Sequence, residues 1–264
     1  MNFSRIAALI QRHGYLYKRS LPRIMEIFFW PLMDLLVWGF ITVYFQKFNI
    51  GLPRFVSFFL GALIFWDILY RAQQGISISF LEEVWSKNLI NLFVSPMRPC
   101  EFLAALMTIS VGKMLTAGAA SALLAWIFYD FNLFVVGISI IPFVFNLLVM
   151  GWAIGIISMS AILRYGQEAE VLAWGLGFLV QPFAAVFYPV SVLPVWIQPI
   201  SRMIPASHVF EGMRALLETG AIPYQSLITA TLLNVIYLSL SISLFYYTLR
   251  VVKEKGLLLH QGTE

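Results

Sequence analysis

The chain has 264 residues, of which 60% are hydrophobic and 11% are charged. Soluble domains usually carry about 25% charged residues, so this composition predicts a polytopic membrane protein. The formal net charge is +4, but the basic residues lie at the ends of apolar segments instead of forming one basic face, which argues against nucleic-acid binding. The single cysteine, Cys100, excludes an intrachain disulfide.

The first 23 residues predict a helix that lies along the membrane surface. Apolar residues such as Phe3, Ile6 and Ile10 can share one helical face, and basic residues fill the rest of the segment. The alternative is a basic tail whose only role is to set orientation, and both roles are compatible.

Six apolar segments predict six membrane-spanning helices. The first, residues 24–45, is long enough to cross a hydrocarbon core of about 30 Å, and Pro31 is expected to kink it. The others are expected at 55–80, at 102–129, at 136–163 with Pro142 inside, from Val171 past Pro182, and at 227–249.

The polar stretch 81–101 interrupts the apolar segments after the second predicted span. Leu81, Trp85, Leu89 and Leu92 fall at spacings of four, four and three, which predicts one short amphipathic helix. The prolines that follow are expected to end it. Such a helix suits docking onto another protein, and equally suits resting on the bilayer surface without a partner.

The segment 183–205 is apolar but is interrupted by four prolines. Because unpaired backbone is costly in hydrocarbon, a continuous lipid-facing helix is not expected here. We predict two short half-helices that enter the membrane, turn back and are covered by protein.

The distribution of basic residues predicts the orientation. With a cytosolic amino end, the inner segments hold 11 Lys and Arg residues and the outer segments hold 4. The positive-inside rule then places both termini in the cytosol, and the proline-rich segment opens outward. The whole chain, 1–264, is expected to form a single transmembrane domain.

Ionisable residues within the predicted spans are candidates for function, because charge inside a membrane is costly and usually faces the protein interior. They are Glu26, Asp34, Asp67, Arg71 and Lys113. One interpretation is a polar lining of a substrate path. The simpler one is a structural ion pair between helices, with Lys113 facing Asp67 or Asp34, while Asp67 and Arg71 pair four residues apart on one helix.

No enzyme motif is present. The chain lacks the glycine-rich loop that cradles phosphates, and its three histidines all lie outside the middle of the spans, so neither a nucleotide site nor a metal or haem site is expected. No acid/base or nucleophile cluster supports a lipid-modifying enzyme.

Two stretches resemble the membrane subunits of ATP-binding-cassette exporters of the ABC-2 type. The first is WSKNLINLFVSPMRPCEF (85–102), which contains a Ser-Pro-x-x-Pro turn at 95–99. The second is YPVSVLPVWIQPISRMIPASHVFEGMRALL (188–217), with its proline punctuation and its segment from Pro205 to Arg214. Many members of the family have Asn-Pro where this chain has Ile204-Pro205. With the basic amino end and six predicted spans, the resemblance covers nearly the whole length.

The resemblance implies an all-α export permease of a bacterial inner membrane that works as a dimer with two separate ATPase subunits. Those subunits would bind ATP and magnesium, and this chain would hold no cofactor. The stretch 81–101 would be the coupling helix of this family. The implied ATPase contact comprises Glu82, Glu83, Trp85, Ser86, Lys87 and Asn88, with a second contact at Arg164, Gln167 and Glu168 in the turn 164–170. Tyr188 and Trp196 would lie near an outer gate.

The substrate stays open between a drug-like molecule, a lipid and a lipid-linked glycan. The function also has an alternative of another class, a carrier or channel driven by an ion gradient without an ATPase. A carrier would be expected to show internal repeats with paired broken helices, and the sequence shows one broken region and no repeat.

Overall fold

The computed structural model describes residues 1–47, 53–131, 137 and 139–256, and all regular structure within these ranges is helical. The elements are α1 (Phe3–Lys18), α2 (Leu21–Lys47), α3 (Pro53–Trp85), α4 (Leu89–Val94), α5 (Pro99–Tyr129), α6 (Ile141–Tyr165), η2 (Gly166–Ala169), α7 (Leu172–Val180), η3 (Gln181–Phe183), η4 (Val190–Val192), α8 (Gln198–Arg202), α9 (Pro205–Thr219) and α10 (Tyr224–Glu254).

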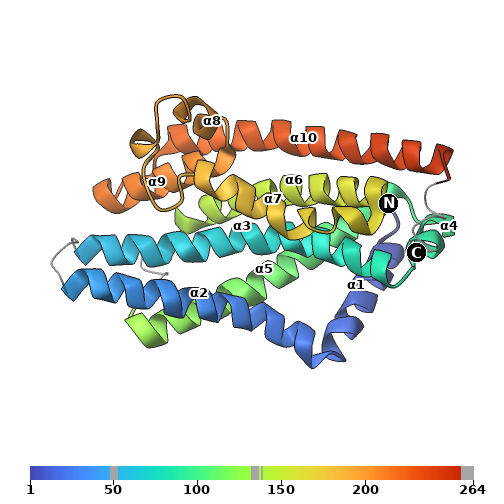
Figure 1. Cartoon of the computed structure of the whole chain (residues 1–264), viewed down its shortest axis with the longest axis horizontal. Helices are drawn as coiled ribbons and strands as arrows, with labels where there is room; N and C mark the ends of the chain where they lie inside the picture. The colour runs from blue at the N-terminus through green and yellow to red at the C-terminus, as the bar shows by residue number, and fades with distance from the viewer. Residues whose placement is uncertain (48–52, 132–136, 138, 257–264) are drawn as a thin grey trace.

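The long helices run side by side along the longest axis of the molecule (Figure 1). One end carries α1 and α4, and we call it the α4 end; the opposite end carries α8 and α9, and we call it the α9 end. The predicted cytosolic stretch and the predicted outward-opening segment therefore lie at opposite ends of the bundle.

Four helices are long and apolar enough to cross a membrane, which confirms the expectation of an all-α membrane protein in its coarse form. They are Leu21–Tyr44 in α2, α5, α6 with its continuation to Ala169, and α10. Their positions agree with four of the six predicted spans. Within α6, however, Pro142 lies in the first turn, where proline is tolerated, and not inside the helix. The predicted start of that span at Val136 lies outside the described residues.

Helix α3 covers the second predicted span but is the central helix of the bundle, and it is not among the four. It packs against α2, α5, α6 and α7. Polar side chains such as Gln73, Ser77 and Ser79 are fully buried along it. A helix surrounded by protein need not be apolar on all sides, because its polar side chains can bond to neighbouring helices instead of facing lipid.

Close helix packing around α3 depends on glycines. A Cβ at Gly151 of α6 would lie 2.6 Å from the Cβ of Ala72, and a Cβ at Gly155 would lie 2.8 Å from the carbonyl oxygen of Gln73. On the other side of α3, a Cβ at Gly75 would lie 2.5 Å from the Cα of Ser110 in α5. These glycines let the helix backbones approach closely, as is common inside membranes.

The fifth predicted span is not one continuous helix. Helix α7 ends at Val180, and the η3 turn at Gln181–Phe183 follows it directly. Nine residues at 1.5 Å each reach roughly 14 Å, about half of a hydrocarbon core. The helical segment passes Pro182 by one residue and ends at Phe183, so the predicted fifth span is much shorter than expected.

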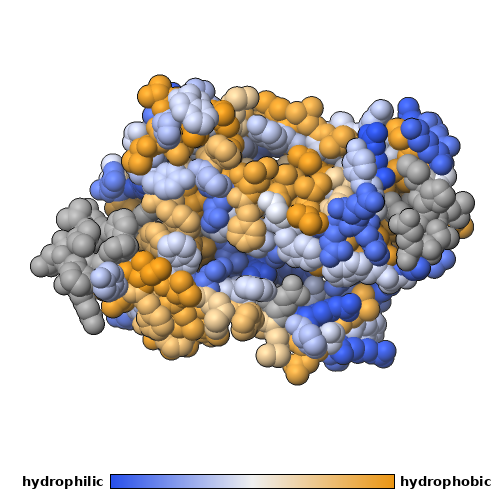
Figure 2. Space-filling model, viewed as in Figure 1, coloured by the Kyte–Doolittle hydropathy of each residue, from blue (hydrophilic) through white to orange (hydrophobic). Residues whose placement is uncertain are grey.

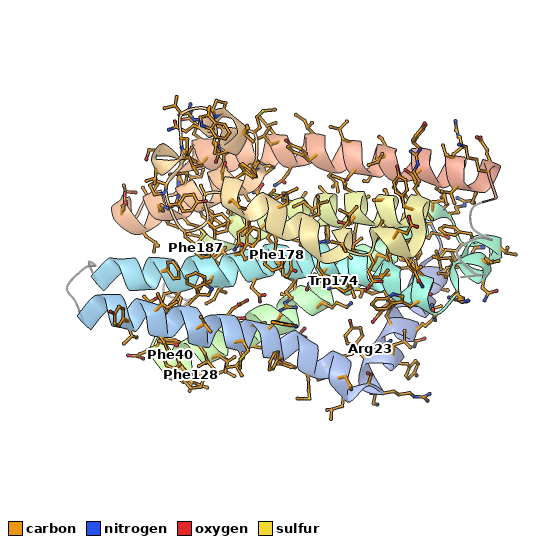
Figure 3. All side chains as sticks on the ribbon, in the orientation of Figure 1. Arg23, Phe40, Phe128, Trp174, Phe178 and Phe187 are labelled. Atoms are coloured by element: carbon orange, nitrogen blue, oxygen red, sulfur yellow. The ribbon has the colours of Figure 1, made fainter. Side chains whose placement is uncertain are left out.

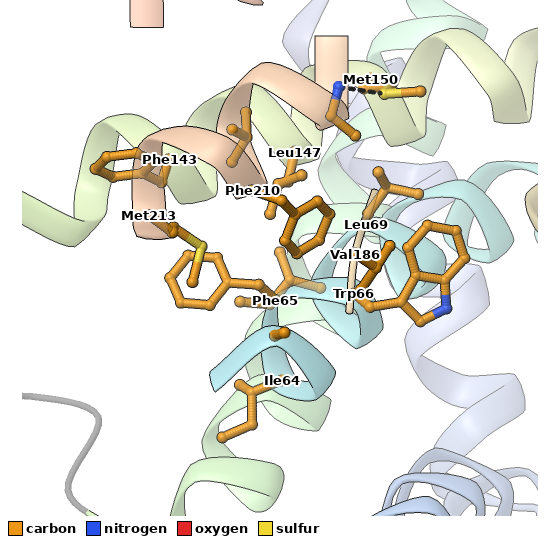
Figure 4. Close-up of a cluster of buried hydrophobic side chains, with 14 of the residues drawn as sticks. Ile64, Phe65, Trp66, Leu69, Phe143, Leu147, Met150, Val186, Phe210 and Met213 are labelled. Atoms are coloured by element: carbon orange, nitrogen blue, oxygen red, sulfur yellow. Dashed lines mark hydrogen bonds between the residues drawn. The ribbon is translucent and has the colours of Figure 1, made fainter. Parts of the chain in front are cut away.

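The α9 end is built from short helical pieces that pack on a hydrophobic core. Phe65 of α3, Phe143 of α6 and Phe210 of α9 are fully buried there (Figure 4). The backbone N–H of Ala206 also points at the sulfur of Met150, 3.3 Å away (Figure 4). The four-proline segment is thus held by protein contacts, and its regular pieces are η4 and the five-residue α8.

The stretch 81–101 differs from the single amphipathic helix expected there. Leu81 to Trp85 form the last turns of α3, and the chain then turns at Lys87, whose φ of 53° is left-handed. Helix α4 follows with six residues. Leu81 and Leu89 are buried as the spacing predicted, but Trp85 is 44% exposed. The turn at Lys87 places the two halves on different axes.

Candidate functional site: an aromatic cavity and the surface at the α4 end

A cavity of about 470 Å³ lies between α2, α3, α5 and α7. Five aromatic side chains line it: Trp30, Trp66, Tyr70, Trp174 and Phe178. The rings of Tyr70 and Phe178 lie 4.8 Å apart, and Trp66 stacks on Tyr70 at 6.5 Å. Trp174 and Phe178 reach from α7 towards α3 (Figure 3). Trp30 belongs to α2, Trp66 and Tyr70 belong to α3, and Trp174 and Phe178 belong to α7.

Three of the predicted intramembrane polar residues meet in this cavity. Arg71 Nε pairs with Asp67 Oδ1 at 3.1 Å, as expected from their spacing, and its Nη1 donates to Gln74 at 3.0 Å. Ser121 of α5 donates to the other oxygen of Asp67 at 3.4 Å. Asp34 of α2 completes the polar lining. The face in Figure 2 shows a hydrophilic hollow flanked by hydrophobic residues.

Lys113 lies outside this cavity. Its Nζ donates to Ser79 Oγ at 2.9 Å and lies 4.6 Å from the centre of the Tyr17 ring of α1. Its positive charge also favours the charged form of Glu82 at the end of α3. The expected partner of Lys113, Asp67, instead has Arg71 and Ser121 beside it. The side chain of the remaining candidate, Glu26, lies outside the described residues.

The two segments predicted to contact an ATPase lie next to each other at the α4 end. The indole N–H of Trp85 donates to Glu170 at 3.2 Å, and its ring lies 6.4 Å from that of Trp174. The end of α3 is thereby tied to the turn between α6 and α7. The exposed members of the two predicted contacts are Trp85, Ser86, Lys87, Arg164, Gln167 and Glu168, with Asn88 half-buried.

Glu82 and Glu83 are buried, unlike the other predicted contact residues. Glu83 is 0% exposed and accepts hydrogen bonds from Arg12 and from Asn88, the latter at 2.7 Å. Arg23 Nε lies 3.2 Å from Glu82. His13 is 1% exposed and lies between the two carboxylates, 3.4 Å from Glu82 and 3.2 Å from Glu83. These contacts fasten α1 and the start of α2 to the end of α3.

The environment of this buried cluster, which lies beyond the predicted second span, favours its charged forms. Burial raises the pKa of Glu83, but hydrogen bonds from His13, Arg12 and Asn88 outweigh it and hold the pKa at about 2. Burial lowers the pKa of His13, but hydrogen bonds and negative charge from Glu82 and Glu83 outweigh it and raise the pKa above 6.5. The cluster therefore acts as an ionic clasp, a role for His13 that its position outside the spans did not suggest.

A second contact fastens α1 to the start of α5. The backbone N–H of Asn2 donates to Glu101 at 2.7 Å, and Arg5 reaches the other oxygen of Glu101 at 3.4 Å. Arg5 also donates to the carbonyl oxygen of Pro96 in the loop before α5. Helix α1 thus braces both sides of the stretch 81–101, with Ile6 and Leu9 packed into the underlying core.

The predicted outer-gate residues lie in the irregular segment at the α9 end. Tyr188 is half-buried and donates to the carbonyl oxygen of Pro182 at 2.6 Å. Trp196 is 73% exposed. The residue that orders this segment is Arg214 of α9, which donates to the carbonyl oxygens of Ala185, of Val186 at 3.2 Å and of Tyr188 at 2.7 Å.

Arg214 also pairs with Glu211 at 3.1 Å, and Glu211 accepts the backbone N–H of Val190 at 2.6 Å. Together they satisfy backbone groups that have no helical partner. The sequence signal that would have indicated this role is a Glu-x-x-Arg pair on the amphipathic helix next to a proline-rich segment.

Within the described ranges, no three side chains of His, Cys, Asp or Glu gather in a way that could hold a metal ion. The polar groups of the cavity form one ion pair, one further carboxylate and neutral hydrogen-bonding groups. This arrangement of a few polar groups in an aromatic wall is suited to binding a ligand.

Comparisons with known proteins return no family for this chain: neither a protein-family model nor a curated protein sequence matches it.

Proposed function

We propose that this chain is the membrane permease subunit of an ATP-driven exporter of the ABC-2 type. It acts as a dimer of two copies, or with a related permease, and each copy docks one separate ATPase subunit. The ATPase supplies ATP and magnesium, while this chain supplies the path through a bacterial inner membrane, with both termini in the cytosol. The exported molecule is drug-like, a lipid or a lipid-linked glycan.

The observation that supports this proposal most directly is the surface at the α4 end. Two segments about 80 residues apart in the sequence lie together there, held by the Trp85–Glu170 hydrogen bond. Their tips, Lys87 on one side and Gln167 and Glu168 on the other, are exposed. A continuous polar surface at one end of an apolar bundle suits the docking of a soluble subunit.

The rigidity of this surface supports a role in coupling. The ionic clasp around Glu83 and the brace at Glu101 attach it to α1, and α3 connects it directly to the cavity. A force applied at the turn after Trp85 would therefore act on the helix that carries Asp67 and Arg71. A permease that is driven by a separate ATPase requires such a direct connection between the docking surface and the cavity.

The test is association with co-expressed ATP-binding-cassette ATPase subunits from the source genome. Glu168→Arg reverses a charge on the exposed turn, and Glu218→Arg makes the same change near the end of α9, where Glu218 is also exposed. We expect at least a fivefold loss of co-purified ATPase for Glu168→Arg and no change for Glu218→Arg, with equal membrane insertion of both. Equal recovery of ATPase with both variants, or no ATPase with the unmodified chain, would overturn the docking assignment.

A further inference from the structure

The side chains that line the cavity between α2, α3, α5 and α7 include two carboxyl groups, Asp34 and Asp67, and one cation, Arg71. Asp67 is neutralised by Arg71 at 3.1 Å, and Arg71 also donates to Gln74. Asp34 lines the same cavity from α2, where the positive charge of Arg71 also acts on it, and among the described residues no direct hydrogen bond or ion pair of Asp34 is seen. The polar wall therefore has one more acidic group than basic groups, and a positively charged ligand can lie beside Asp34.

The rest of the wall is aromatic. Trp30 and Trp66 lie beside the carboxylates in the lining, and Tyr70, Trp174 and Phe178 continue the wall towards α7. Aromatic faces attract cations, and they also bury apolar groups. An acidic residue within an aromatic wall thus favours a ligand that is both positively charged and apolar.

The same features disfavour other ligand classes. An anion would have to separate Arg71 from Asp67 and Gln74, which already occupy it. A glycan needs many hydrogen-bonding partners, and the lining offers few polar groups beyond those already bonded to one another. The volume of about 470 Å³ falls within the range of about 300–1,000 Å³ that is typical of cavities for drug-sized molecules.

We propose that this cavity binds a lipophilic organic cation, with Asp34 as the counter-charge and the rings around Trp30, Trp66 and Trp174 as the apolar wall. The ligand carries a delocalised or quaternary positive charge and bulky apolar groups. This inference deepens the proposed function, because the bound cation is then the exported substrate, but the binding itself needs no ATPase.

The test is binding of radiolabelled tetraphenylphosphonium to the purified full chain in lipid nanodiscs, with empty nanodiscs as the background. Asp34→Asn removes the charge while keeping the shape, Asp34→Glu restores the charge, and Asp130→Asn makes the same change outside the cavity. Asp130 is exposed at the end of α5, in a left-handed conformation that asparagine also adopts. Each variant is first checked for a monodisperse elution profile and unchanged helicity.

We expect saturable binding that weakens about tenfold or more in Asp34→Asn, which corresponds to about 1.4 kcal/mol, with near-normal binding for Asp34→Glu and Asp130→Asn. Tetraphenylborate, an anion of the same shape, is expected not to compete. Absence of saturable binding, equal affinity of Asp34→Asn and the unmodified chain, or competition by the anion would each overturn the site.

The two proposals fail separately. Saturable binding that depends on Asp34, without ATP-driven transport in the presence of an associated ATPase, would refute the exporter and leave the cation site standing. ATP-driven export of another compound by a chain that does not bind the cation would refute the site alone.

Discussion

Replacing Glu83 with glutamine tests the ionic clasp at the α4 end. Glu83 is 0% exposed and accepts hydrogen bonds from Arg12 and Asn88, and His13 Nε2 lies 3.2 Å from its carboxylate. The substitution keeps the size of the side chain but removes its charge. Arg12 can turn towards water because its side chain is 36% exposed, whereas His13 cannot, because it is 1% exposed. The buried histidine would then keep only Glu82 as a charged partner.

The magnitude follows from the pKa of Glu83. Its ordinary value is 4.5 and its value in the folded chain is about 2, so folding stabilises the charged form by about 3 kcal/mol. Removing one partner of a buried ion pair typically costs about 3–5 kcal/mol, which agrees with this figure. For a chain of this size, 1 kcal/mol shifts the melting temperature by about 2–4 °C, so we expect Glu83→Gln to lower it by about 6–12 °C.

The single cysteine provides the assay. Cys100 is half-buried in the first turn of α5, next to the brace at Glu101, and it reports unfolding by reacting with a fluorogenic maleimide during heating. Glu168→Gln is the matched control, because Glu168 is exposed at the same end, and we expect a shift of less than about 1 °C for it. Equal melting temperatures for Glu83→Gln and Glu168→Gln would refute the clasp.

Three further predictions concern other parts of the fold. The pKa of His13 is raised on folding, so the contribution of His13 to folding stability is fully present below pH 6.5 and is lost as the pH rises through the raised pKa. The melting temperature of the unmodified chain should therefore exceed that of His13→Asn by more at pH 6 than at pH 9. Gly151→Ala should destabilise the chain by about 1–3 kcal/mol because its Cβ would meet the α3 backbone, whereas Gly112→Ala, with nothing within 4 Å, should be neutral or stabilising in the same thermal assay; equal effects would contradict the close packing. Arg214→Gln removes hydrogen bonds to the irregular segment at the α9 end, so it should lower the melting temperature by about 4 °C or more and speed proteolysis of that segment. Arg202→Gln is the control, because the Arg202 side chain is exposed, and it should do neither.

Four of the long helices were predictable because the membrane imposes a simple rule of length and hydropathy on them. Long apolar runs identify α2, α5, α6 and α10 within a few residues. The fifth span was predicted too long, since the apolar sequence continues after Phe183, where the helical backbone ends. The amphipathic spacing around Trp85 was read as one helix, because a period of apolar residues does not reveal a turn such as the one at Lys87.

The site was predictable in its residue types but not in its pairings. The Asp67–Arg71 pair follows from local spacing and is confirmed. Two partners of Glu83, His13 and Arg12, are 70 and 71 residues away in α1, and no local pattern connects them to Glu83. An exposed glutamate such as Glu168 and a buried one such as Glu83 therefore look alike in the sequence, and only the structure shows which of them is buried.

Transport in inside-out membrane vesicles tests the central claim most directly. Vesicles that contain the chain, with and without its associated ATPase, are given ATP and a panel of fluorescent cationic drugs, lipids and glycolipids, in the presence of an ionophore that abolishes ion gradients. The proposed exporter predicts accumulation of at least one compound that requires both the ATPase and ATP and that persists with the ionophore. Accumulation at full rate without the ATPase, and its loss on adding the ionophore, would contradict the claim and identify a carrier driven by an ion gradient.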